Sequence, residues 1–176
     1  HLLIDYTDDL LSSKKDIERS KIYENLMSLN SVITVPVEGL GNKIKEKGKK
    51  VFVIPDGIDN FQSINPFNKK NKKVNILWNG HSSNINSLIR IIKTNLLDYS
   101  YNLHIISNSS SFDILNKTQF NTSLKCVPFA HLWSIKKLQT ISKKCDFAIL
   151  PTDKLWASAN RLVTNFRLGL PVIAET

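Results

Sequence analysis

The stretch SANRLVTNFRLGLPVIAET (residues 158–176) contains a helix, a break and a strand in direct succession. Leu162, Val163 and Phe166 recur at helical spacing, and the Gly-Leu-Pro segment at 169–171 predicts the turn that ends the helix. The apolar run that follows is typical of a buried parallel strand. A helix that leads straight into such a strand is the repeating half of a βαβ unit.

The same alternation extends through the rest of the chain. Strands are expected at HLLID (1–5), SVITV (31–35), VFVIP (51–55), VNILWN (74–79), NLHIIS (102–107), LKCVPF (124–129), DFAILP (146–151) and PVIAE (171–175). Helical spacing of apolar residues separates them, with Ser13 and Asp16 expected as a capping box, Ser83, Ser134 and Ser158 as N-caps, and Gly48 as a stop. Strands and helices that alternate in this way predict parallel sheets.

A polar segment divides the pattern into two parts. Residues 59–73 contain Pro66 and a cluster of lysines, and we interpret them as a solvated linker. We therefore expect an α/β protein with two Rossmann-like parallel-sheet domains, at residues 1–58 and 74–176. The chain begins with His1 and ends within an expected strand, so we expect a piece of a longer polypeptide, with the first domain incomplete and the second lacking its last helices.

Composition narrows the classes of function. The net charge of +9 is compatible with nucleic acid, anionic lipid or a phosphorylated ligand, but the lysines are scattered outside the linker, so we do not expect nucleic-acid binding. Cys126 and Cys145 fall in expected buried strands and should be free thiols. The four histidines are isolated in sequence, and no metal site is expected.

Ligands of open parallel sheets bind beyond the carboxyl ends of the strands. Gly80 follows one such strand and would let a ligand approach the backbone, and the helix start after it would offer N–H groups to an anion; an ordinary strand-to-helix turn explains the glycine equally well. Arg161 lies near the start of a later helix, where a cation opposes the helix dipole unless an anion is bound. An arginine that points into solvent, or pairs with Asp153, is the alternative.

Four segments resemble the group-1 branch of nucleotide-sugar glycosyltransferases with the GT-B fold. They are VIPDGID (53–59), ILWNGHSSN (76–84), DFAILPTD (146–153) and NRLVTNFRLGLPVIAE (160–175), in the order and spacing of that family. The resemblance implies two Rossmann-like domains, a UDP- or GDP-sugar donor on the second, and a glycan or lipid-linked acceptor on the first. It also implies a retaining, metal-independent transfer without a cofactor in the cytoplasm, with peripheral association with a membrane left open.

The resemblance also assigns residues to the donor. The diphosphate would face Gly80, His81 and Ser82, the base would be bordered by Val127, Pro128 and Phe129, and the ribose or phosphates would face Asn160, Arg161 and Thr164, with Asp153 nearby.

One departure from the family leaves other functions open. Many members carry two glutamates with seven residues between them, and Trp156 and Thr164 occupy those positions here. The catalytic residues are therefore unknown, and the isolated chain is expected to bind a donor without transferring its sugar. A non-catalytic sugar-nucleotide-binding module and a sugar-nucleotide epimerase of the same fold are the alternatives.

Overall fold

The computed structural model describes residues 2–6, 17–29, 31–55, 57, 73–94, 99–119, 125–151 and 160–175. These residues form two compact units. The first contains the described residues up to Gly57 together with Asn160, and the second contains those from Lys73 to Pro151 and from Arg161 onward. Each unit alternates helices with strands of a parallel sheet, which confirms the expected α/β class with parallel, Rossmann-like sheets.

The first unit contains a sheet of three parallel strands in the order β1-β2-β3. The strands are β1 (Leu2–Asp5), β2 (Ser31–Val35) and β3 (Lys50–Val53), and the helices are α1 (Ile17–Ser28) and α2 (Glu38–Lys45). Gly48 adopts φ +75° just after α2, as expected of the residue that stops this helix. The core of the unit lies between β2 and α2, where Ile33 and Leu40 are fully buried.

The second unit contains a sheet of five parallel strands in the order β6-β5-β4-β7-β8. The strands are β4 (Asn75–Asn79), β5 (Tyr101–Ser107), β6 (Cys126–Leu132), β7 (Phe147–Leu150) and β8 (Val172–Ala174). The first strand of the unit, β4, therefore lies in the middle, and the chain continues first to one side of it and then to the other. This is the doubly wound order, whose switch point lies between β4 and β7.

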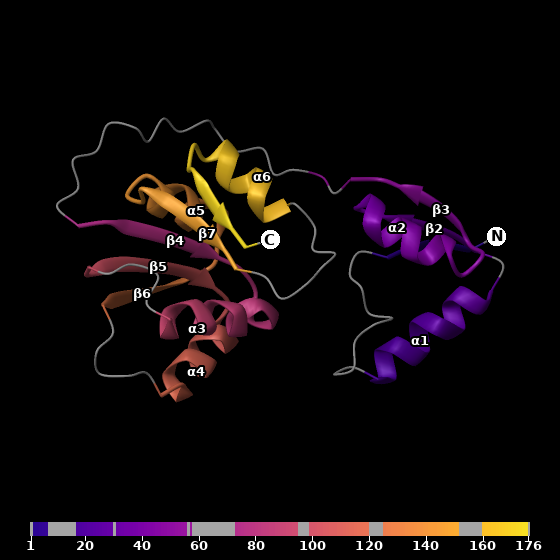
Figure 1. Ribbon diagram of the computed structural model, residues 1–176, viewed down its shortest axis with the longest axis horizontal. Coiled ribbons are helices and arrows are strands. Elements are labelled where there is room, and N and C mark those ends of the chain that lie inside the picture. The colour runs from indigo at the N-terminus through magenta and orange to yellow at the C-terminus, as the bar shows by residue number, and fades with distance from the viewer. Residues whose placement is uncertain are drawn as a thin grey trace. The chain divides into compact units, whose positions relative to one another are not determined.

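Helices cover both faces of this sheet (Figure 1). They are the short 3₁₀ turn η1 (Ser82–Asn84), α3 (Ile85–Lys93), α4 (Ser109–Lys117), α5 (Ile135–Ser142) and α6 (Asn160–Arg167). Figure 1 shows α3 and α4 on one face and α5 and α6 on the other. Successive strand residues point to opposite faces, so Trp78 joins the core with α3 while Leu77 joins the core with α5.

Several boundaries and caps differ from the expectations. Strand β6 begins and ends later than 124–129, and the N-cap before η1 is His81, whose side chain accepts from the Ser83 N–H, so the prediction of Ser83 as the cap is wrong. The Ser134 cap is confirmed, since its hydroxyl accepts a hydrogen bond of 3.1 Å from the Lys137 N–H. The predicted caps at Ser13, Asp16 and Ser158 lie outside the described residues.

Both cysteines are buried and free, as predicted. Cys126 opens β6 and Cys145 lies just before β7, and two strands, β5 and β4, separate β6 from β7 in the sheet. Strands lie ~4.8 Å apart, so the two residues are beyond the ~7 Å that a disulfide allows between Cα atoms.

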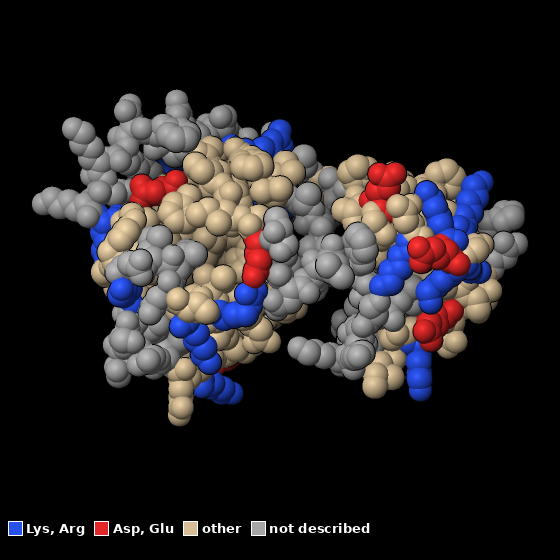
Figure 2. Space-filling model, viewed as in Figure 1, with Lys and Arg blue, Asp and Glu red and all other residues tan. Residues whose placement is uncertain are grey.

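Charged side chains of both signs lie on the face of each unit that Figure 2 shows. Figure 2 shows Lys and Arg on the visible face of each unit, with acidic and uncharged residues between them. Among the described helices, none has both the length and the apolar character that a bilayer span requires.

Candidate functional site

The carboxyl ends of β4 and β7 are the candidate site of the second unit, because ligands of open parallel sheets bind where the strand order reverses. At this switch point the connections from β4 and β7 lead to helices on opposite faces of the sheet, as Figure 1 shows. The described residues at this edge are Gly80 after β4, Asn108 after β5 and Pro151 after β7. The side chain of Arg161, from the first turn of α6, reaches the same edge.

The loop after β4 is held in place by its neighbour, the loop after β5. The buried Ser107 hydroxyl donates to the Gly80 carbonyl at 2.5 Å, and the Gly80 N–H donates to the Ile106 carbonyl at 3.1 Å. The Ser82 N–H donates to Oδ1 of Asn108 at 3.0 Å, and the Ser111 hydroxyl donates to the same oxygen at 2.9 Å. These bonds fix the backbone of residues 80–82 against the end of β5.

The N–H groups at the start of the helix after β4, which the sequence suggested for an anion, already have partners within the protein. The Ser82 N–H is taken by Asn108, the Ser83 N–H by Nδ1 of His81 at 3.4 Å, and the Asn84 N–H by the His81 carbonyl at 2.9 Å. The prediction that this helix start offers free donors is therefore wrong. His81 is exposed and acts as the cap, and Ser82 is half-buried between His81 and Asn108.

Arg161 supplies the positive charge at this edge. Its guanidinium is largely buried, and this burial lowers the pKa of Arg161 from its ordinary value. Nη1 has no hydrogen-bond partner among the described residues, and a Cβ built on Gly80 would lie 3.2 Å from it. The alternative of an arginine in solvent is thus contradicted, while Asp153, the other suggested partner, lies outside the described residues.

Other buried polar atoms of the second unit also lack hydrogen-bond partners in the described part of the chain. They are Nε1 of Trp78, Oδ1 of Asn79, and both side-chain polar atoms of Asn165. Trp78 and Asn165 are fully buried and Asn79 is 5% exposed. Buried polar groups are normally hydrogen-bonded, so each of these unpaired atoms marks a position where a bound polar molecule or water would complete a hydrogen bond.

Sequence reasoning missed Trp78, Asn79 and Asn165, although two signals pointed to the asparagines. Asn79 follows three consecutive apolar residues at the end of β4, and Asn165 follows Arg161 by four residues, which places both on one face of α6.

The two remaining α6 residues assigned to the donor occupy different environments. Thr164 is half-buried, one turn after Arg161. Asn160 is exposed and is grouped with the first unit, whereas Arg161 is grouped with the second. The structure thus brings Arg161 to Gly80 and places Thr164 on the same helix, and Asn160 stays a prediction.

The segment expected to border the base lies away from this edge. Val127, Pro128 and Phe129 are in the middle of β6, with Pro128 four residues before the strand ends at Leu132. At ~3.3 Å per residue, Pro128 is ~13 Å from the carboxyl end of β6. Their side chains also alternate, so that Val127 and Phe129 share a face and Pro128 is on the other. After β6, the residue that lies at this edge is Trp133, whose N–H donates to the Ser107 carbonyl at 2.8 Å.

No family model, no curated protein and no solved structure matches the chain. Among the described residues, no group of three or more His, Cys, Asp or Glu side chains is arranged to hold a metal ion.

Replacing Ser107 should loosen the loop that carries Gly80. The Ser107→Ala variant leaves the Gly80 carbonyl without this donor and removes one of the two side-chain contacts of the buried Ser111 hydroxyl, so its free energy of unfolding should fall by ~1–3 kcal/mol. Urea unfolding measures the change. The matched control is Ser110→Ala, an exposed serine of α4, which should stay within ~0.5 kcal/mol of wild type. Equal effects of the two substitutions would contradict a structural role for Ser107.

A pair of histidines lies elsewhere in the second unit, on the face covered by α5. Nδ1 of His104 and Nε2 of His131 are 3.1 Å apart, with the rings stacked at 5.4 Å, and Phe129 stacks on His104 from 5.1 Å. Burial lowers the pKa of both histidines, and positive charge on His131 and Lys144 lowers that of His104 further. For His131 the nearby charges are those of Lys137 and Lys144.

This pair should make folding stability depend on pH. Both folded-state pKa values lie below the ordinary value of 6.5, so the unfolded chain binds more protons in mild acid. Stability is therefore fully present above about pH 6.5 and falls as the pH decreases towards the lowered pKa values. Urea unfolding at neutral pH and in mild acid measures the loss, which His131→Gln should reduce. A loss of stability that is identical in wild type and variant would show that other groups cause it.

Proposed function

We propose that the second unit binds a nucleotide-sugar through its diphosphate at the carboxyl edge between β4 and β7, and that the chain is part of a GT-B glycosyltransferase. The observation that carries this proposal is the largely buried guanidinium of Arg161, whose Nη1 lies beside Gly80 and has no hydrogen-bond partner among the described residues. A buried charge without a counter-charge is costly, whereas a phosphate beside it would form charge-assisted hydrogen bonds. Arg161 also lies in the first turn of α6, whose dipole attracts the same anion.

The other unpaired buried atoms of the second unit fit the same ligand class. Nε1 of Trp78 is a second N–H donor near Gly80, suited to an anionic oxygen. The amides of Asn79 and Asn165 offer acceptors and a donor, which suits hydroxyl groups or water. A nucleotide-sugar carries both kinds of group: phosphates, which would accept from the donors, and hydroxyls, which would bond to the amides.

In this reaction the residues of the chain would bind and orient the donor. Gly80 allows the diphosphate to approach the backbone, because a side chain there would occupy the space beside Arg161. Arg161 would offset the negative charge that grows on the diphosphate as the bond to the sugar breaks. We further propose that the acceptor is a glycan or a lipid-linked glycan, that the transfer is retaining, and that it occurs in the cytoplasm.

A non-catalytic binding module is the second candidate. It is favoured by Thr164, a half-buried hydroxyl at a position where the family that the chain resembles carries a glutamate. Such a module would bind the nucleotide-sugar at Arg161 without transferring the sugar.

A product assay separates the candidates. The protein is incubated with UDP- and GDP-sugars and a glycan acceptor, and the sugar-containing products are identified by mass spectrometry. A glycosyltransferase lengthens the glycan, an epimerase yields an altered nucleotide-sugar, and a binding module yields neither while still binding the donor. Absence of both product formation and donor binding would overturn the proposal.

A further inference from the structure

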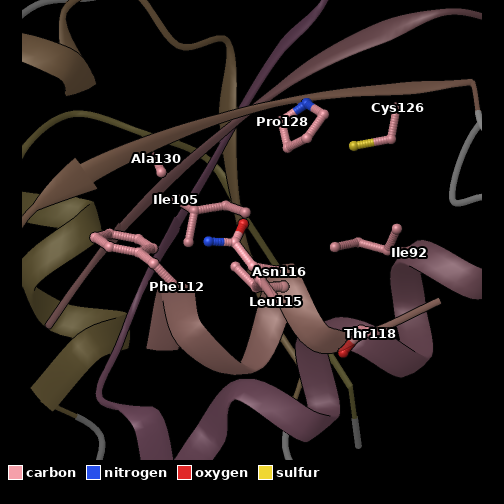
Figure 3. A pocket seen from close by; sticks show the side chains of 9 residues that line it. All are labelled: Ile92, Ile105, Phe112, Leu115, Asn116, Thr118, Cys126, Pro128 and Ala130. Carbon is pink, nitrogen blue, oxygen red and sulfur yellow. The ribbon is translucent and has the colours of Figure 1, made fainter. Parts of the chain in front are cut away.

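A hollow of about 360 Å³ opens beneath the edge of the sheet, away from the site described above. It lies between α3, α4 and strand β6, as Figure 3 shows. Its walls are Ile92 of α3, Phe112 and Leu115 of α4, and Ile105 of β5. Nothing proposed for the nucleotide-sugar uses this space.

The sequence of β6 creates the hollow. Cys126, Pro128 and Ala130 alternate along the strand and all face α3 and α4, while the residues between them point to the opposite face. Small side chains on one face of an edge strand leave room that the helices do not fill. Pro128 also removes an N–H from the edge, which disfavours addition of another strand there.

The size and lining of the hollow are those of a ligand site. Pockets for small molecules have volumes of roughly 300–1,000 Å³ and apolar walls with a few polar groups. An apolar cavity of ~150 Å³ already binds benzene, so 360 Å³ has room for a longer hydrocarbon of about eight to ten carbons.

Besides the Cys126 thiol, the described lining has two polar side chains, Asn116 and Thr118. The Asn116 amide points into the hollow in Figure 3 and makes no side-chain hydrogen bond to another described residue. The Thr118 hydroxyl donates to the Ile114 carbonyl at 2.8 Å, which leaves its oxygen free to accept. The Asn116 amide by itself suits a hydroxyl group, since it can both donate a hydrogen bond to it and accept one from it. None of the described side chains that line the hollow carries a charge, so an ionised ligand would find no charged partner among them; Lys73, whose positive charge acts on Cys126, lies outside this lining.

We propose that this hollow binds an uncharged aliphatic alcohol or similar hydroxylated hydrocarbon, with its chain between β6 and α4 and its hydroxyl at Asn116. The site is independent of the nucleotide-sugar site and does not rest on the proposed function.

Cys126 provides a reporter inside the hollow. Its sulfur lies among the lining atoms in Figure 3. Burial raises the pKa of this thiol to about 11, so its modification is slow enough to follow. Cys145 is buried in the core on the other face of the sheet and serves as an internal control for opening of the whole unit.

The experiment follows thiol modification of the whole chain by methyl methanethiosulfonate, with mass spectrometry of the peptides that contain each cysteine. With 1-octanol at about ten times its dissociation constant, modification of Cys126 should slow about tenfold, because only the unoccupied fraction reacts. Cys145 should be unaffected. Octanoate, which carries a charge, should protect Cys126 far less than 1-octanol does.

Two variants complete the test. Ala130→Leu fills the hollow from β6 and should abolish protection by 1-octanol, while Val127→Leu, on the opposite face of the same strand, should keep it. An unchanged rate at Cys145 in both variants shows that they are folded. Absence of protection in wild type, or protection that survives Ala130→Leu, would overturn the proposal, and equal protection by octanoate would overturn the assignment of an uncharged ligand.

Discussion

Arg161→Ala should weaken the binding of a nucleoside diphosphate by about 1.5–3 kcal/mol, the range for a hydrogen bond to a charged group. The same substitution should leave the free protein as stable as wild type, to within ~1 kcal/mol, or make it slightly more stable. The guanidinium is buried with Nη1 unpaired, so removing it relieves a desolvated charge and takes away no described hydrogen bond at that nitrogen.

These opposite effects separate a binding residue from a structural one. Calorimetric titration with UDP and GDP measures the affinity, and urea unfolding without ligand measures the stability. Arg167→Ala is the matched control, because Arg167 is exposed in the last turn of the same helix. A loss of more than ~1 kcal/mol of stability in free Arg161→Ala would identify Arg161 as structural.

Gly80→Ala should damage both stability and binding. The new Cβ would lie 2.7 and 2.9 Å from Cζ2 and Cη2 of Trp78, a side chain that is fully buried and has no room to move away. Overpacking of this kind costs ~1–3 kcal/mol of folding stability. The Cβ would also lie 3.2 Å from Nη1 of Arg161 and would displace the guanidinium, so diphosphate affinity should fall about tenfold or more.

Gly57→Ala is the control for Gly80→Ala, because a Cβ there meets nothing within 4 Å. Urea unfolding and calorimetric titration compare the two variants. If Gly80→Ala proves as stable as Gly57→Ala and binds the diphosphate normally, Trp78 and Arg161 do not pack so closely around Gly80 that they exclude a side chain there.

The sequence predicted most of the architecture, because each buried parallel strand is visible in the sequence as an apolar run about as long as the strand itself. Such runs placed β4 and β7 within one or two residues of their positions. Strand β6 was placed too early, since it lies at the sheet edge and most of its residues are exposed. Its last residues, Ala130 to Leu132, therefore carry no apolar signal that sets them apart from a loop.

The site was harder to predict, because its contacts join residues far apart in the chain. Asn108 takes the Ser82 N–H from 26 residues away, and no local pattern shows that this donor is used. The position of Arg161 near a helix start was visible in the sequence, but its burial against Gly80 depends on how α6 packs on the sheet. Whether a single buried atom such as Oδ1 of Asn79 lacks a hydrogen-bond partner depends on all of its neighbours in the folded structure, so the sequence does not show it.

The most direct test of the central proposal is thermal unfolding of the wild-type protein with UDP, GDP and ADP in turn. A ligand that binds only the folded state at 100 times its dissociation constant stabilises it by ~2.7 kcal/mol, so at least one of the three should raise the melting temperature by several degrees. Arg161→Ala should show little of this increase at the same ligand concentration. If none of the diphosphates raises the wild-type melting temperature, the carboxyl edge between β4 and β7 is not a nucleotide-sugar site.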